Sequence, residues 1–78
     1  MARVLLFGAL ADIAGWRERD IAGDSVEALR ATLCADERLA ERLGRPGLMR
    51  VVNQVIVRGN PPVGPDDEVA FAPPVSGG

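Results

Sequence analysis

Histidine, lysine and tyrosine are absent from this 78-residue chain, and Cys34 is its only cysteine. Without histidine, a serine or cysteine nucleophile has no imidazole base, and without lysine no Schiff base can form. One cysteine can neither close an internal disulfide nor, without histidine, build a soft zinc site. The residue types therefore exclude most catalytic classes for this chain acting alone, and we expect it to hold no metal ion.

Long apolar segments are absent as well. No stretch approaches the roughly 20 apolar residues that cross a bilayer, and no charged start followed by an apolar core marks a secretory signal. Nine arginines against eleven acidic residues give a formal charge of −2, which disfavours nucleic acid as a partner. We expect a cytoplasmic protein that binds neither membrane nor nucleic acid.

The chain is long enough for one small domain, because domains usually span about 100–150 residues. Its 47% hydrophobic and 26% charged residues are typical of a folded soluble protein. Short apolar runs bounded by glycine or proline predict strands, and a turn-rich stretch predicts a loop at 58–67. The expected strands are 3–8, 17–22 and 68–72, with either one bulged strand or two over 49–52 and 55–57.

Helices are predicted by spacing and by capping residues. Val26, Leu29 and Leu33 recur at three and four residues, which makes one apolar stripe that covers a sheet. Asp24 or Ser25 can cap this helix, because each has a side-chain oxygen for an unpaired backbone N–H. A short helical turn is expected at 9–14, and a second helical piece follows the main helix after a break at 35–36.

This order of elements predicts an α+β fold in which one main helix lies across a small mixed sheet, the β-grasp (ubiquitin-like) arrangement. A ferredoxin-like fold would need another substantial helix late in the chain. We therefore expect a β-grasp domain at 1–72 and an extended C-terminal tail at 73–78.

The tail has the composition of an arm that enters another protein. Pro73 and Pro74 fix φ and lack N–H donors, so the last strand cannot continue through them. Gly77 and Gly78 have no side chain, so these peptide units can pass through a channel that a Cβ would block. The reactive group at the end is a carboxylate, which reacts with a nucleophile only after activation. Two terminal glycines that merely fray are the alternative.

Four segments of the chain resemble the small subunit of molybdopterin synthase, and the similarity covers nearly the whole sequence. The run from Glu68 to Gly78 is the most specific, since related thiamine-pathway carriers share Gly-Gly but not typically the Pro-Pro-Val-Ser before it. One departure is Ala72, where family members commonly carry a second aromatic residue. The matching segments are Val4-Leu5-Leu6-Phe7, Val26-Glu27-Ala28-Leu29-Arg30, Val52-Asn53-Gln54 and Asp67-Glu68-Val69-Ala70-Phe71-Ala72-Pro73-Pro74-Val75-Ser76-Gly77-Gly78.

The resemblance implies a sulfur carrier whose Gly78 is adenylated and then converted to a thiocarboxylate, which donates sulfur to cyclic pyranopterin monophosphate to form the dithiolene of molybdopterin. The implied partners are the large synthase subunit, in a heterotetramer, a ubiquitin-activating-like adenylyltransferase and a sulfur donor protein. ATP and Mg²⁺ would belong to the activating enzyme, with no cofactor bound by this chain alone. The expected partner-binding residues are Phe7, Phe71, Pro73, Pro74, Val75, Ser76 and Gly77.

Three other functions stay open: a sulfur carrier for thiamine or nucleoside thiolation, a ubiquitin-like protein modifier, and an adaptor with an inert tail. For Cys34 we expect packing in the core rather than redox chemistry, whereas Trp16 fits a partner contact and a lid on the core equally well. Asn53 and Gln54 are expected to satisfy backbone groups at a turn or bulge. The acidic run 66–68 is expected to be solvated rather than to bind a cation.

Overall fold

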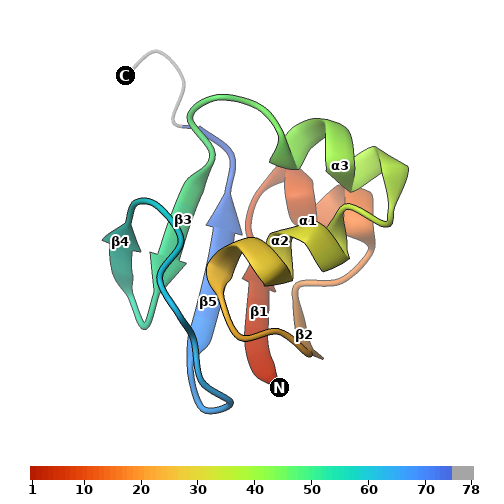
Figure 1. The fold of residues 1–78 in the computed structure, drawn as a ribbon. Helices are drawn as coiled ribbons and strands as arrows, with labels where there is room; N and C mark the ends of the chain where they lie inside the picture. Colours follow the sequence, from red (N-terminus) through yellow and green to blue (C-terminus); the bar gives the residue numbers. More distant parts are fainter. Residues whose placement is uncertain (75–78) are drawn as a thin grey trace.

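Five strands form one mixed sheet in the computed structural model, which describes residues 1–74. Their order across the sheet is β2-β1-β5-β3-β4, with β1 and β5 parallel at the centre and every other pair antiparallel. The first and last strands are therefore neighbours (Figure 1). The strands are β1 (Ala2–Leu6), β2 (Glu18–Ile21), β3 (Met49–Val52), β4 (Val55–Val57) and β5 (Glu68–Ala72).

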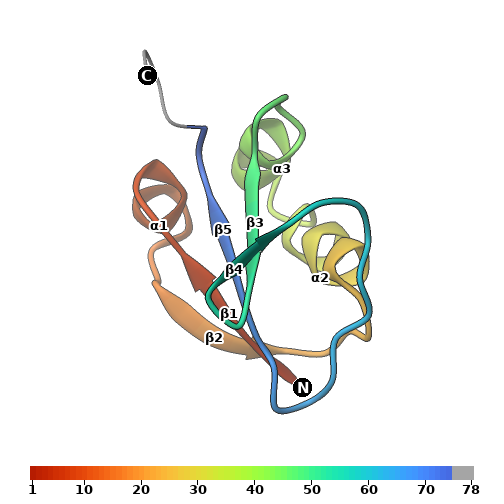
Figure 2. The ribbon, with the colours of Figure 1, turned by 90° about the vertical axis from the view of Figure 1, so that its left-hand side faces the viewer.

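Helix α2 (Val26–Leu33) lies across one face of this sheet, and α3 (Glu37–Leu43) follows it on the same side (Figure 2). The short helix α1 (Ala9–Ala14) follows β1 and contacts α3. Val26, Leu29 and Leu33 are all buried, as the apolar stripe predicts. The predicted β-grasp fold is confirmed. No helix in residues 1–74 has the length and hydropathy needed to span a bilayer.

The core lies between α2 and the inward face of the two central strands. Alternate residues of β1 and β5 point toward the helix, and the largest buried side chain is Phe71. Burial of each large apolar side chain stabilises the fold by about 1.5–3 kcal/mol. The residues of β1, β5 and α2 that have 0–1% exposed area are Ala2, Val4, Leu6, Val26, Leu29, Val69 and Phe71.

The bounds of the first two strands differ from the sequence prediction of 3–8 and 17–22, because the strands are Ala2–Leu6 and Glu18–Ile21. The first strand ends at Leu6, so Phe7 and Gly8 lie beyond it. Asn53 and Gln54 both have positive φ, 49° and 70°, which makes a two-residue hairpin turn. Of the two alternatives for 49–57, the structure therefore has two strands rather than one bulged strand.

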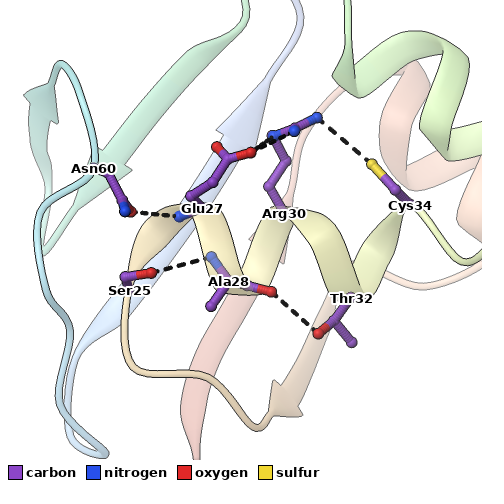
Figure 3. Close-up of polar contacts among 7 residues, drawn as sticks. All are labelled: Ser25, Glu27, Ala28, Arg30, Thr32, Cys34 and Asn60. Atoms are coloured by element: carbon purple, nitrogen blue, oxygen red, sulfur yellow. Dashed lines mark hydrogen bonds and ion pairs between the residues drawn. The ribbon is translucent and has the colours of Figure 1, made fainter.

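The cap of α2 is Ser25 and not Asp24. The Ser25 hydroxyl accepts a hydrogen bond from the Ala28 N–H at 3.1 Å (Figure 3). The Glu27 N–H donates to the Asn60 side-chain oxygen at 2.8 Å. The Val26 N–H donates to the Pro61 carbonyl at 3.1 Å, so three unpaired N–H groups at the helix start are satisfied, one by the cap and two by the 58–67 loop.

Asp67 and Asn53 join this loop to the β3–β4 hairpin. The Asp67 carboxylate accepts hydrogen bonds from the Gly64 N–H at 2.7 Å and from the Asn53 amide at 3.0 Å. The Asn53 oxygen in turn accepts from the Glu68 N–H at 3.0 Å. The predicted role of Asn53 at a turn is confirmed. The Gly64 N–H, and after it the Asn53 amide, lower the pKa of the Asp67 carboxyl.

Replacing Ser25 with alanine should lower the free energy of unfolding by about 1 kcal/mol, because one N–H of α2 loses its partner. Asp24→Ala is the matched control, since the Asp24 side chain makes no hydrogen bond within residues 1–74. Urea unfolding of both variants measures the difference. Equal losses in the two variants would contradict the assignment of the cap.

Asp67 should also make stability depend on pH. Because folding lowers its pKa, the stabilisation is present above the unfolded pKa of about 3.9 and is lost as pH falls through the folded value. Asp67→Asn should therefore have a lower urea midpoint than the wild type at pH 6, and the two midpoints should converge near pH 2. Asp66→Asn, at a side chain with no hydrogen bond among the described residues, should follow the wild type at both values.

Candidate functional site

The chain leaves the sheet at the end of β5, where Pro73 and Pro74 lie against two glycine turns. A Cβ at Gly8 would come within 3.3 Å of Pro73 Cγ, and one at Gly47 within 2.9 Å of Pro74 Cβ. Both glycines have positive φ, 58° and 86°. The root of the tail therefore depends on two close approaches that a larger residue would obstruct.

The predicted tail is only partly within the described residues. Pro73 is half-buried and Pro74 is exposed. The division into 1–72 and 73–78 stays a prediction, because Val75, Ser76, Gly77 and Gly78 lie outside the described residues. Gly8 and Gly47 are the residues that sequence analysis missed, since a glycine in a turn does not indicate which distant segment it meets.

The face of the sheet turned away from α2 is apolar toward the tail, whereas Glu18 lies beside Leu5 on β2 and the row toward the N-terminus, Asp20, Arg3 and Glu68, is charged. Leu5, Ala70, Val51 and Ile56 are register partners in one row across β1, β5, β3 and β4. Ile56, on the edge strand, is 65% exposed. Ala72 and Met49 form the next pair toward the tail. We call these six residues the apolar face.

Phe7 and Phe71 differ in their exposure to solvent. The Phe7 N–H donates to the Phe71 carbonyl at 3.1 Å, so Phe7 is fixed where β1 ends, and its side chain is 47% exposed. Phe71 has no exposed area and packs in the core under α2. The expectation that Phe71 binds a partner is therefore corrected. The exposed Phe7 side chain stays available for contact with a partner.

Cys34 and Trp16 both pack against the core in the structure. Cys34 is half-buried, and its Sγ accepts a 3.6 Å hydrogen bond from Arg30, which also pairs with Glu27 (Figure 3). This pairing lowers the pKa of the Glu27 carboxyl and raises that of Arg30. The Arg19 guanidinium lies 4.7 Å from the centroid of the Trp16 ring. Packing thus accounts for both residues.

Within residues 1–74, no group of three or more acidic, cysteine or histidine side chains is arranged to hold a metal ion. The carboxylate of Asp67, in the acidic run 66–68, is engaged by Gly64 and Asn53. The described part of the chain has an apolar face, the exposed Phe7 and a tail exit packed against two glycine turns. This arrangement can dock against a protein and direct the C-terminus into it.

Comparison with known proteins bears on this arrangement. The molybdopterin synthase sulfur carrier subunit of Escherichia coli (strain K12) is 40% identical to this chain over 81 residues, with all of both chains covered. Two solved structures share the fold. The solution structure of small archaeal modifier protein 1 from Methanosarcina acetivorans has a TM-score of 0.85 at 22% identity and covers 99% of this chain and 95% of its own.

The crystal structure of small archaeal modifier protein 1 from Haloferax volcanii has a TM-score of 0.75 at 26% identity, covering 99% of this chain and 98% of its own. The family model described as ThiS family matches residues 4–78, which includes the central strands, the apolar face and the tail. With a family match over almost its entire length, this chain belongs to the ThiS family.

Proposed function

We propose that this protein is the sulfur carrier subunit of a molybdopterin synthase and that Gly78 carries the sulfur as a terminal thiocarboxylate. The observation that carries the proposal is the 40% identity, over the full length of both chains, to a protein of that function. The ubiquitin-like fold and the tail that leaves from the central strand support it. The chain acts as one component of a two-protein enzyme.

The chemistry requires an activating enzyme. A carboxylate is a poor electrophile because its charge repels nucleophiles and oxide is a poor leaving group. Transfer of an adenylyl group from ATP to Gly78 releases pyrophosphate and gives a mixed anhydride, and attack by sulfur at the sulfide oxidation level then expels AMP and leaves the terminal thiocarboxylate. Mg²⁺ and cationic groups of the activating enzyme stabilise the ATP phosphates, and a sulfur donor protein supplies the sulfur.

The large synthase subunit then receives the loaded tail. A thiocarboxylate is a soft nucleophile, and a narrow pocket of the partner would orient it toward the cyclic pyranopterin monophosphate and exclude water. Each transfer forms a C–S bond to the substrate with loss of a C–O bond there, and water then cleaves the thioester to Gly78 and restores its carboxylate. Two such transfers complete the dithiolene. In this assembly, proposed to be a heterotetramer, the apolar face and Phe7 bind the large subunit while Pro73 to Gly78 enter it.

The tests also address two other functions, conjugation to other proteins and sulfur delivery to another pathway. The modifier proteins resemble this chain at 22% and 26% identity, below the 40% of the sulfur carrier subunit, so conjugation to other proteins is less well supported. Sulfur delivery to another pathway would use the same thiocarboxylate. Binding of the large synthase subunit separates that pathway from molybdopterin synthesis.

The tail is tested by Gly78→Ala and by a variant with one residue added after Gly78. Both changes should abolish formation of the thiocarboxylate while leaving thermal unfolding unchanged, because a Cβ or an extra residue displaces the carboxyl in the partner's channel. Intact-mass analysis after incubation with activating enzyme, ATP and sulfur donor detects the exchange of one oxygen for sulfur. If the wild-type chain shows no exchange, the proposed function is wrong.

The apolar face is tested by Ile56→Ala, with Phe7→Ala as a second variant. Each should weaken binding to the large synthase subunit by about 1–3 kcal/mol, the value of one large apolar side chain buried at an interface. Val55→Ala is the matched control, because Val55 is 62% exposed on the same strand but points to the opposite face of the sheet. Isothermal titration calorimetry measures the affinities, and an equal loss for Val55→Ala would contradict the assignment.

A further inference from the structure

A small cavity lies at the root of the tail, between α1, α3 and the two prolines. Its volume is about 160 Å³. Apolar walls come from α1 and from the prolines, and two arginines close one side. The lining residues are Ala9, Leu10, Arg42, Arg45, Pro73 and Pro74, and we call this set the tail-root site.

The tail-root site has a surplus of positive charge. Arg45 is exposed and pairs with Glu41 at 2.7 Å, whereas Arg42 is half-buried and forms no ion pair within residues 1–74. Of the two cations, only Arg45 thus has a carboxylate partner among the described residues, in a chain whose formal charge is −2. A half-buried cation without a counter-ion is partly desolvated and unbalanced, so a carboxylate that approaches it is attracted more strongly than in bulk water.

The opposite end of the sheet has the opposite character. A second cavity there, of about 350 Å³, is lined by four carboxylates and one arginine. Because β1 and β5 are parallel, this end holds the N-terminus, and the tail leaves from the other end (Figure 1). Of these two cavities, the one where the tail exits is the one whose charged lining residues are all cationic. The charged residues of the second cavity are Arg3, Asp20, Asp66, Asp67 and Glu68.

Two simpler roles do not account for this site. A cation in the last turn of α3 interacts favourably with the helix dipole, which explains Arg42 alone but neither the cavity nor Arg45. A role at the reacting carboxyl is disfavoured by distance. Four residues after Pro74 span about 13–14 Å when extended, so an arm that enters a partner carries the carboxyl of Gly78 beyond the reach of either arginine.

We propose that the tail-root site binds an aspartate or glutamate side chain of the large synthase subunit, at the mouth of the channel that receives the tail. The two guanidinium groups provide planar N–H donors that match both oxygens of a carboxylate. Ala9, Leu10 and the prolines pack against its methylene groups. This ion pair sets the direction in which the tail enters, and the inference rests on the proposed function.

The test is isothermal titration of the large synthase subunit of the same organism with the full chain and with charge-reversed variants. Arg42→Glu and Arg45→Glu should each raise the Kd about tenfold or more, because the partner's carboxylate then faces a like charge. Arg3→Glu is the matched control: it is also an exposed arginine in an ion pair, with Glu18, but at the opposite end, and it should change the Kd less than about threefold.

The second test measures how the affinity depends on salt concentration and whether reversing a charge on the large subunit restores binding. Raising the salt concentration should weaken wild-type binding more than binding by the double variant Arg42→Gln, Arg45→Gln. Changing acidic residues of the large subunit around the channel mouth to arginine, one at a time, should identify one that restores binding to Arg42→Glu. Unchanged affinity in the reversed variants, or an effect seen only with the activating enzyme, overturns the proposal.

Failure of this inference can be distinguished from failure of the proposed function. If the wild-type chain binds the large subunit and acquires sulfur, but charge reversal has no effect, only the tail-root site is wrong. If the wild-type chain neither binds nor acquires sulfur, the proposed function is wrong. Thermal unfolding of each variant establishes that the fold is intact, so a loss of affinity reports on the interface.

Discussion

Parallel pairing of the first and last strands is the constraint on which the rest of the structure depends. Leu6 faces Phe71 in this register, and the Phe7 N–H continues the ladder by donating to the Phe71 carbonyl. Both strands end at the same end of the sheet. Their pairing therefore brings together the exposed Phe7, the turn at Gly8 and the exit of the tail. The buried rows of β1 and β5 lie under α2, so the hydrophobic core holds this exit rigid. A flexible exit would lose orientational entropy at every docking event.

Local signals in the sequence predicted most of the elements, because they depend on residues close together in the chain. The stripe of α2 and the apolar run of β1 are of this kind. These local signals were insufficient where a contact with a distant segment of the chain determines the structure. Asp24 and Ser25 are equally good caps by type, but only Ser25 has its oxygen toward the Ala28 N–H. Asn53 and Gln54 suit a bulge as well as a turn, and the pairing of β3 with β4 selects the turn.

The same division holds at the candidate site. The tail motif is contiguous, so its residues can be proposed from sequence alone, and Phe7, also predicted to contact a partner, has an exposed side chain. Phe71 was expected to contact a partner because a solvent-facing aromatic on either strand would make an interaction patch, and the sheet register instead places it under α2. Gly8, Gly47, Arg42 and Arg45 were missed. They are separated by up to 39 positions and meet only because α1, α3 and the prolines converge at one end of the sheet.

A carrier that is loaded by one protein and discharged by another has to bind each tightly enough to act and weakly enough to leave. Large apolar contacts mainly slow dissociation, whereas charges near an interface mainly speed association and fix orientation. The apolar face has only six residues, two of them alanines, so it provides limited affinity. The positive tail-root site lies at the opposite end of the sheet from the cavity with four carboxylates. In the proposed complex its charge sets the orientation in which the carrier binds. That orientation by charge would bring the tail to the channel mouth first, without an interface that holds the discharged carrier in place.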